Sequence, residues 1–137
     1  MFLLGIPLLI IPFAIYNMIA FITPGVSWSQ EIVRLHMMSG ADWTLTLGEL
    51  IIALSILILF VEILKATRMG TRGLMDHILS LVLFVVMLIE FLMVPQAATG
   101  TLFLILVISF VDVVAGFSVA VRAARRDISV ESADATP

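Results

Sequence analysis

Four acidic residues lie inside long apolar stretches of the sequence, where a carboxylate requires a physical explanation. They are Glu49, Glu62, Glu90 and Asp112. If such a stretch crosses a membrane, a charge at its centre costs roughly 2.5–3.5 kcal/mol, and an acid there is a candidate for proton or ion chemistry. The same acid can instead cap a helix, pair with a base or hydrogen-bond a neighbouring helix, so each acid must be weighed against these structural roles.

Asp112 lies deepest, in the middle of the stretch LVISFVDVVAGFSV. It is ten residues after Leu102 and nine before Val121, which places it about 13–15 Å from either end of a helix at 1.5 Å per residue. No Lys, Arg or His is expected at that depth. Such an acid either joins helices through a hydrogen bond or carries a proton, and packing is the simpler interpretation.

Three small residues share a helical face with Asp112, and together they predict a packing surface. Ser109, Gly116 and Ala120 lie near this face at i−3, i+4 and i+8. Gly116 and Ala120 form a small-xxx-small pair, which lets another helix approach closely. The face is therefore expected to turn into the bundle or into a contact between copies. Ser55, at similar depth in the second apolar stretch, is the expected hydrogen-bond partner of Asp112.

The other three acids have simpler explanations near helix ends. Glu49 follows Thr46 by three residues, which is the spacing of a capping box. Glu62 has Lys65 at i+3 and can form an ion pair with it. Glu90 lies about 6 Å of helix rise below the outer end of the third stretch, shallow enough for its side chain to reach the membrane surface or to meet Arg34. A functional role is as good an interpretation of Glu90 as a structural one.

Two residues at the start of the third stretch have structural interpretations of the same kind. Asp76 is the natural N-cap of a helix there, with Ser80 one turn further on. His77 is expected to be an interface residue rather than a proton relay.

Some of these polar residues could meet in a pocket on the outer side of the membrane, where Asn17 and His36 also lie. The candidate intramembrane polar site consists of Asp112, Glu90, Glu49, Asn17 and Ser55. His36 with two glutamates would make a zinc-like ligand set, but no pair of ligands at i, i+4 supports one. We therefore predict no metal and no cofactor.

The composition of the chain requires an apolar environment beyond its own core. Of its 137 residues, 62% are hydrophobic and 12% are charged, whereas soluble domains are about 45–50% apolar and about 25% charged. A domain this small buries only a modest fraction of its surface, so a bilayer must cover the rest. The net charge of −3 argues against nucleic acid as a partner, and the absence of cysteine excludes disulfides and thiol catalysis.

Four apolar stretches have about the 20 residues that a helix needs to cross a hydrocarbon core of about 30 Å. They cover approximately residues 2–22, 45–64, 78–94 and 102–121. In lipid every backbone polar group must be satisfied within the segment, so each stretch is predicted to be a helix. Pro7 and Pro12 each remove a backbone donor, so the first half of the first helix is expected to be kinked or irregular.

Basic residues indicate the orientation of these helices. Only Arg34 lies between the first and second predicted spans. Six basic residues follow the second or the fourth span: Lys65, Arg68, Arg72, Arg122, Arg125 and Arg126. By the positive-inside rule both termini are cytoplasmic, and these side chains can also contact anionic lipid headgroups. For so compact a chain we expect the cytoplasmic (inner) membrane of a bacterium.

The segment between the first two spans is predicted to form a short helix in the outer membrane interface. The residues SWSQ at 27–30 fit a capping box. Trp28, Ile32 and Leu35 follow at i, i+4 and i+7, which is the spacing of one helical face. Trp28 and Trp43 would then lie at the level of the lipid headgroups.

The end of the second span and the start of the third resemble voltage-sensor domains, which are also four-helix bundles with cytoplasmic termini. The second helix of that family carries a Phe, an acid and a base, which correspond to Phe60, Glu62 and Lys65. The acid of its third helix corresponds to Asp76. Only Val61 separates Phe60 from Glu62, which departs from the family's spacing. The fourth span lacks the arginines that are the family's gating charges, so voltage sensing is not predicted and no family is assigned.

The chain is thus predicted to be an all-α integral membrane protein. Residues 1–126 form a four-transmembrane-helix bundle with cytoplasmic termini and an interfacial helix, and residues 127–137, which are polar and acidic, form a disordered tail. No catalytic motif is present, so we expect no enzyme. The first functional hypothesis is a non-catalytic accessory, scaffold or assembly subunit, as a homo-oligomer or with a membrane-protein partner. The alternative is a channel or transporter for protons or small ions that uses Asp112.

Overall fold

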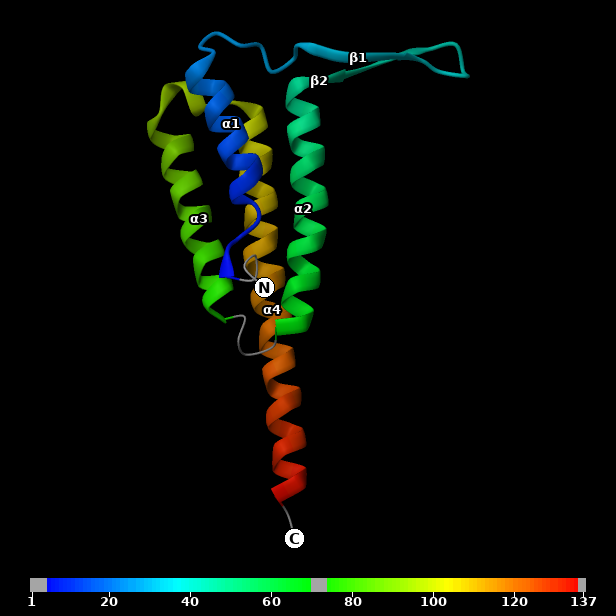
Figure 1. Ribbon diagram of the computed structural model, residues 1–137. Coiled ribbons are helices and arrows are strands. Elements are labelled where there is room, and N and C mark those ends of the chain that lie inside the picture. Colours follow the sequence, from blue (N-terminus) through cyan, green and yellow to red (C-terminus); the bar gives the residue numbers. More distant parts are fainter. Residues whose placement is uncertain (1–4, 70–73, 136–137) are drawn as a thin grey trace.

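The computed structural model describes residues 5–69 and 74–135, which are mostly helical (Figure 1). The helices are α1 (Ile10–Ile22), α2 (Leu47–Met69), α3 (Leu74–Met93) and α4 (Gly100–Ala135). An antiparallel hairpin of β1 (Glu31–His36) and β2 (Asp42–Thr46) joins α1 to α2, and a short 3-10 turn, η3 (Pro95–Ala97), joins α3 to α4. The hairpin defines one end of the bundle, the hairpin end, and the opposite end is called the distal end.

Three helices are long and apolar enough to cross a membrane. The segments are Leu47–Thr67, Leu74–Met93 and Gly100–Val119. Large apolar side chains cover their outward faces; Leu57 is 67% and Leu92 is 68% exposed. An apolar surface of this extent requires a hydrocarbon environment. The chain is therefore a helical, membrane-embedded protein.

α1 is shorter than the predicted first span. Its 13 residues rise about 20 Å, less than the hydrocarbon thickness of about 30 Å. The helix begins only at Ile10, because Pro7 in the irregular segment before it lacks a backbone donor. Pro12 lies in the first turn of the helix, where a missing donor is tolerated. The expected irregular first half is thus confirmed. Within residues 5–69 and 74–135 three helices have spanning length, whereas the sequence predicted four.

The predicted interfacial helix is wrong, because its residues form the β-hairpin. Gly40 has a φ of 93°, which glycine adopts without strain, and it turns the chain back between the strands. The N–H of Met37 donates to the carbonyl oxygen of Ala41 at 2.8 Å and closes this turn. The capping box of residues 27–30 does not form, since the hydroxyls of Ser27 and Ser29 bond to each other at 2.9 Å.

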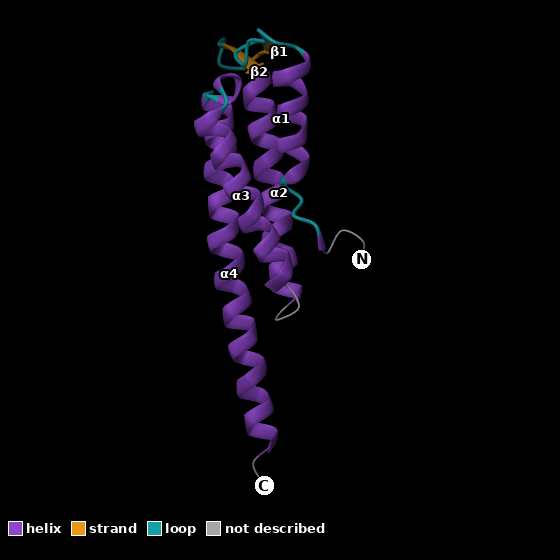
Figure 2. Cartoon of the chain, turned by 90° about the vertical axis from the view of Figure 1, so that its left-hand side faces the viewer, coloured by secondary structure: helices purple, strands orange, loops and turns teal. Residues whose placement is uncertain are grey.

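α4 is the central helix of the bundle and packs against both α2 and α3 (Figure 1). The core around it is apolar, and its fully buried members include Leu9, Tyr16, Met87, Leu102 and Ile105. α4 also continues past the distal ends of the other helices (Figure 2). Residues 127–135, expected to be disordered, are helical here. No Gly or Pro interrupts the chain between Gly116 and Pro137, so a helix already nucleated by its membrane span can propagate.

Gly48 allows α2 and α4 to approach each other at the hairpin end. A Cβ atom at this position would lie 2.5 Å from Oγ1 of Thr101 and 3.1 Å from the carbonyl oxygen of Trp28. The same carbonyl accepts a hydrogen bond of 2.9 Å from the N–H of Gly48. A Cβ would therefore meet the side chain of Thr101 on α4 and the backbone of Trp28, and the backbone oxygen cannot rotate away as a side chain can.

We expect Gly48→Ala to lower the free energy of unfolding by about 1–3 kcal/mol, which is the usual cost of overpacking. The measurement is reversible unfolding by SDS in mixed micelles, followed by circular dichroism. Gly100→Ala is the matched control, because a Cβ there meets nothing within 4 Å. Equal stability of the two variants would show that the α2–α4 contact is not tight.

Candidate functional site

Six polar side chains from three helices are buried together in the half of the bundle toward the distal end. This polar cluster consists of Glu62, Lys65, Asp76, His77, Ser80 and Asp112, each at most 9% exposed. A membrane-embedded protein rarely buries so many ionisable groups without a functional or structural reason. The cluster is therefore the candidate functional site.

The ammonium group of Lys65 lies among oxygen atoms from three segments. Its Nζ is 3.2 Å from Oε1 of Glu62 on α2 and 3.6 Å from Oδ1 of Asp76 on α3. It also donates to the carbonyl oxygen of Ile6 at 3.0 Å. Oε1 of Glu62 accepts a further hydrogen bond of 2.7 Å from the N–H of Leu8. The pair of Lys65 and Glu62 thus ties the segment before α1 to α2 and α3.

Asp112 brings α4 into the same cluster. Its side chain is 3% exposed and interacts with the hydroxyl of Ser80 on α3. The carboxyl group is within electrostatic range of Glu62 and Asp76, which repel a negative charge, and of Lys65, which attracts one. The acid that looked isolated in the sequence therefore lies among charged groups of two other helices.

The expected partner of Asp112 makes a different contact. Ser55 is fully buried, but its hydroxyl donates to the carbonyl oxygen of Ile51 in its own helix at 2.8 Å. Ser80 is the serine close to Asp112, and its hydroxyl also donates to the carbonyl oxygen one turn back in its own helix, that of Asp76, at 3.1 Å. A serine hydroxyl in a helix can always reach the carbonyl one turn back, so depth alone did not identify the partner.

The small-residue face of α4 lies against α3 of the same chain. A Cβ at Gly116 would lie 2.8 Å from Nδ1 of His77, and the ring centroids of His77 and Phe117 are 5.6 Å apart. Ser109 on this face is 1% exposed. The side chain of Ala120 is outside the described part of the chain. The glycine thus lets an imidazole ring pack directly on the backbone of α4.

Several polar atoms of this region have no hydrogen-bond partner among the described residues. They are both carboxylate oxygens of Asp76, Nε2 of His77 and Oγ of Ser109, although Asp76 is still near Lys65. Buried polar atoms are normally hydrogen-bonded, and exceptions indicate water or a functional role. The cluster also holds three carboxyl groups against one lysine.

Two other predicted site residues lie at the hairpin end, apart from the cluster. Oδ1 of Asn17 and Oε2 of Glu90 are buried without a hydrogen-bond partner among the described residues. Glu90 is within electrostatic range of the hydroxyl of Tyr16, which bonds to Oγ1 of Thr99 at 2.6 Å. His36 lies away from them on the hairpin and bonds to Asp42. The polar residues thus form two groups rather than one outer pocket.

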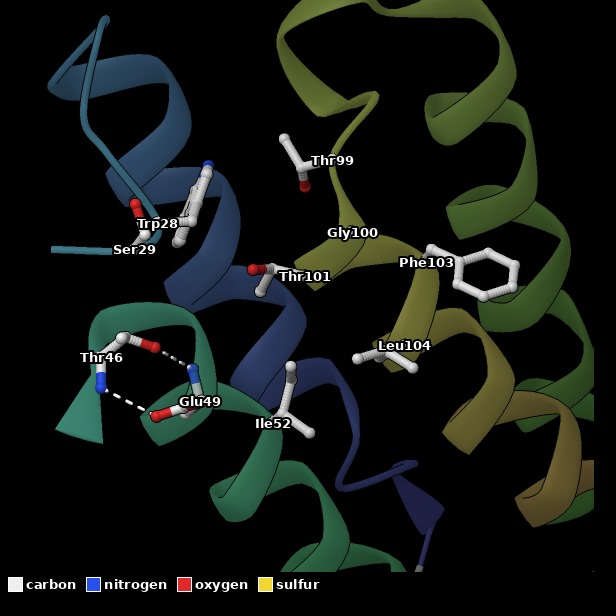
Figure 3. A pocket seen from close by; sticks show the side chains of 10 residues that line it. All are labelled: Trp28, Ser29, Thr46, Glu49, Ile52, Thr99, Gly100, Thr101, Phe103 and Leu104. Atoms are coloured by element: carbon white, nitrogen blue, oxygen red, sulfur yellow. Dashed lines mark hydrogen bonds between the residues drawn. The ribbon is translucent and has the colours of Figure 1, made fainter. Parts of the chain in front are cut away.

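Glu49 forms the predicted capping box. Its carboxylate accepts the N–H of Thr46 at 3.0 Å, and its own N–H donates to the hydroxyl of Thr46 at 3.2 Å (Figure 3). Both residues line a groove of about 670 Å³ on the surface between α2 and α4. Ile52, Phe103 and Leu104 make the apolar part of its lining (Figure 3). Glu49 therefore joins the hairpin to α2 and takes no part in the polar cluster.

The basic residues fall into two environments. Lys65 was expected at the lipid headgroups but is buried, because two carboxylates hold it inside the bundle. Arg122, Arg125 and Arg126 are exposed on α4. Arg72 and the side chain of Arg68 are outside the described residues.

Sequence reasoning did not join Asp76, His77 and Ser80 to Asp112. It placed Asp76 and His77 at a helix end. Asp76 and Ser80 are four residues apart, however, which puts them on one helical face. The short connection between α2 and α3 was the available signal, because it brings Glu62 and Lys65 near the start of α3. In the described residues no three or more His, Asp or Glu residues are grouped so that they could hold a metal ion.

Comparisons with protein-family models, with curated proteins and with solved structures give no match to this chain. Its function must therefore be argued from its own geometry.

We expect Lys65→Met to lower the free energy of unfolding by about 3–5 kcal/mol, because it leaves buried carboxylates without their cation. Arg34→Met is the matched control. It removes the base of the ion pair between Glu31 and Arg34, which has the same i, i+3 spacing but is exposed. Solvent screens that exposed pair, so its loss should lower the free energy of unfolding far less. Unfolding by SDS in mixed micelles measures both, and losses of equal size would contradict a stabilising role for the cluster.

Proposed function

We propose that the chain is a non-catalytic accessory or assembly subunit of a membrane complex. It crosses the bacterial inner membrane four times and has both termini in the cytoplasm. The fourth crossing would consist of α1 and the irregular segment before it, which reaches Glu62 through Leu8. The orientation is supported by Arg122, Arg125 and Arg126, which follow the α4 span at the distal end.

The extension of α4 beyond the bundle is the observation that carries this proposal. Figure 2 shows the helix continuing alone past the distal ends of α2 and α3. Val121 is 48% and Ile128 is 62% exposed, and their spacing of seven residues puts them on the same helical face. A single helix gains most of its stability from packing an apolar face, so this extension is suited to docking on a partner.

The polar cluster supports the same proposal by its effect on rigidity. It links the segment before α1 to α2, α3 and α4 through Glu62, Lys65, Asp76 and Asp112. A bundle held together at its distal end keeps the base of the α4 extension in a fixed direction. A fixed base reduces the entropy that docking must overcome.

A second candidate function is the transport of protons or small cations, and one observation favours it. The cluster has three carboxyl groups and one lysine, and Asp76 and His77 have buried atoms without hydrogen-bond partners among the described residues. If all three carboxyl groups were ionised and His77 neutral, the cluster would carry two uncompensated negative charges. Because burying them is costly, the site is suited to binding a proton or a cation.

Truncation after Arg126 tests the accessory function and keeps the three arginines that orient the helix. Native mass measurement after extraction with a lipid-preserving polymer should find the full chain in a larger complex, and the truncated chain and Ile128→Glu as single copies. Ser118→Ala is the control, because its hydroxyl only bonds to its own helix at Val114. A full chain that is always a lone monomer would remove the proposal.

Proteoliposomes with one dye sensitive to pH and one sensitive to small cations test the transport function. On that proposal Asp112→Asn should reduce proton or cation flux by at least about tenfold, as expected when an essential proton-transfer group is lost. Glu49→Gln is the control, since Glu49 caps a helix outside the cluster. Absence of flux from the unchanged protein, or equal flux from Asp112→Asn, would remove transport as a function.

A further inference from the structure

The β-hairpin is held across the hairpin end of the bundle. β2 ends at Thr46 and α2 begins at Leu47 without a linker, and the capping box of Glu49 and Thr46 fixes this junction. Figure 1 shows the hairpin projecting sideways over α2, across the direction of the helices and at the level where they end. If the helices cross the membrane, the hairpin lies along its surface.

One face of the hairpin is apolar. Directly paired residues of an antiparallel ladder point to the same side. Two such pairs make up this apolar face: Val33 with Leu45, and Leu35 with Trp43. Val33 is 40%, Leu35 is 49% and Trp43 is 44% exposed. These side chains therefore lack a cover from the described part of the chain.

The opposite face is polar, and its charged side chains bond to one another. Arg34 donates to both carboxylate oxygens of Glu31, at 2.9 and 3.0 Å. Nδ1 of His36 lies 2.7 Å from Oδ1 of Asp42. Glu31 and Arg34 would point to opposite sides of a regular strand, but an irregularity between Glu31 and Val33 places both on one face. The bulge thus separates the apolar residues from the charged ones.

We infer that the apolar face of the hairpin lies on the membrane surface at the hairpin end, with Trp43 at the boundary between headgroups and acyl chains. The polar face then points to water. This inference concerns the end of the molecule opposite the α4 extension and does not depend on the proposed function.

The lipid surface fits this face better than a second protein. An amphipathic element in the plane of a membrane buries its apolar side at the interface, where tryptophan is enriched. The polar face offers little charge to attract a charged partner. Arg34 offsets Glu31, and with histidine counted as neutral a single negative charge is left on Asp42. Four half-exposed side chains also offer only on the order of a few hundred Å², whereas a stable interface needs about 800 Å² from each partner.

Fluorescence of Trp43 tests the inference. The chain has two tryptophans, so Trp28→Phe leaves Trp43 as the only tryptophan. Trp28 stacks on Tyr16, and phenylalanine keeps an aromatic ring at that position. The protein is placed in vesicles of phosphatidylcholine brominated at either a shallow or a deep acyl position. We expect the shallow bromines to quench Trp43 by at least about twofold and more than the deep ones.

Two variants on neighbouring positions provide the matched comparison. Leu35→Glu places a charge on the apolar face and should remove most of the lipid quenching, whereas Thr44→Glu, on the polar face, should leave it unchanged. Because the Trp28→Phe measurement needs neither variant, the test stands even if Leu35→Glu does not fold.

Two results would overturn the inference. In the first, Trp43 is quenched by aqueous acrylamide but not by brominated lipid, which means that the face points to water. In the second, Trp43 is protected from both quenchers and loses this protection on dilution with lipid, which means that a second copy covers the face.

Discussion

The arrangement of the bundle depends on how one lysine is held among carboxylates inside a membrane-embedded protein. Lys65 contacts Glu62 on its own helix and Asp76 on α3, and it also donates to the backbone oxygen of Ile6. Moving ions out of water is costly, and the cost is offset only when partners and hydrogen bonds are placed well. The relative positions of α2, α3 and the segment before α1 are therefore set by the contacts of this one cation.

Close approach between helices makes the rest of the polar cluster possible. Gly48 brings α4 against α2 at the hairpin end, and Gly116 lets the ring of His77 reach the backbone of α4 further along the helix. Between these two points α4 carries Asp112 to the position where it interacts with Ser80. The two ends of the molecule then differ in character, because one carries an amphipathic hairpin across the ends of the helices and the other a single helix that continues past the bundle.

Local features of the fold could be predicted from the sequence. The lengths of the apolar stretches indicated α2, α3 and α4, and Pro7 indicated the irregular start of α1, because these features depend on composition and backbone donors within one segment. The outer segment was predicted incorrectly as a helix. Trp28, Ile32 and Leu35 have helical spacing, but Gly40 and the cross-strand pairing of residues 31–46 favour a hairpin, and that pairing is not a local property.

The sequence by itself determined that Asp112 is far from both ends of its apolar stretch and that small residues share its helical face, since both follow from counting along one helix. Only the tertiary structure decided that it meets Ser80 instead of Ser55 and lies near Lys65. That choice depends on the rotation and the vertical register of three helices relative to one another. Neither quantity is specified by the periodicity of any single helix; both are set by the packing of glycines and the pairing of buried charges between helices.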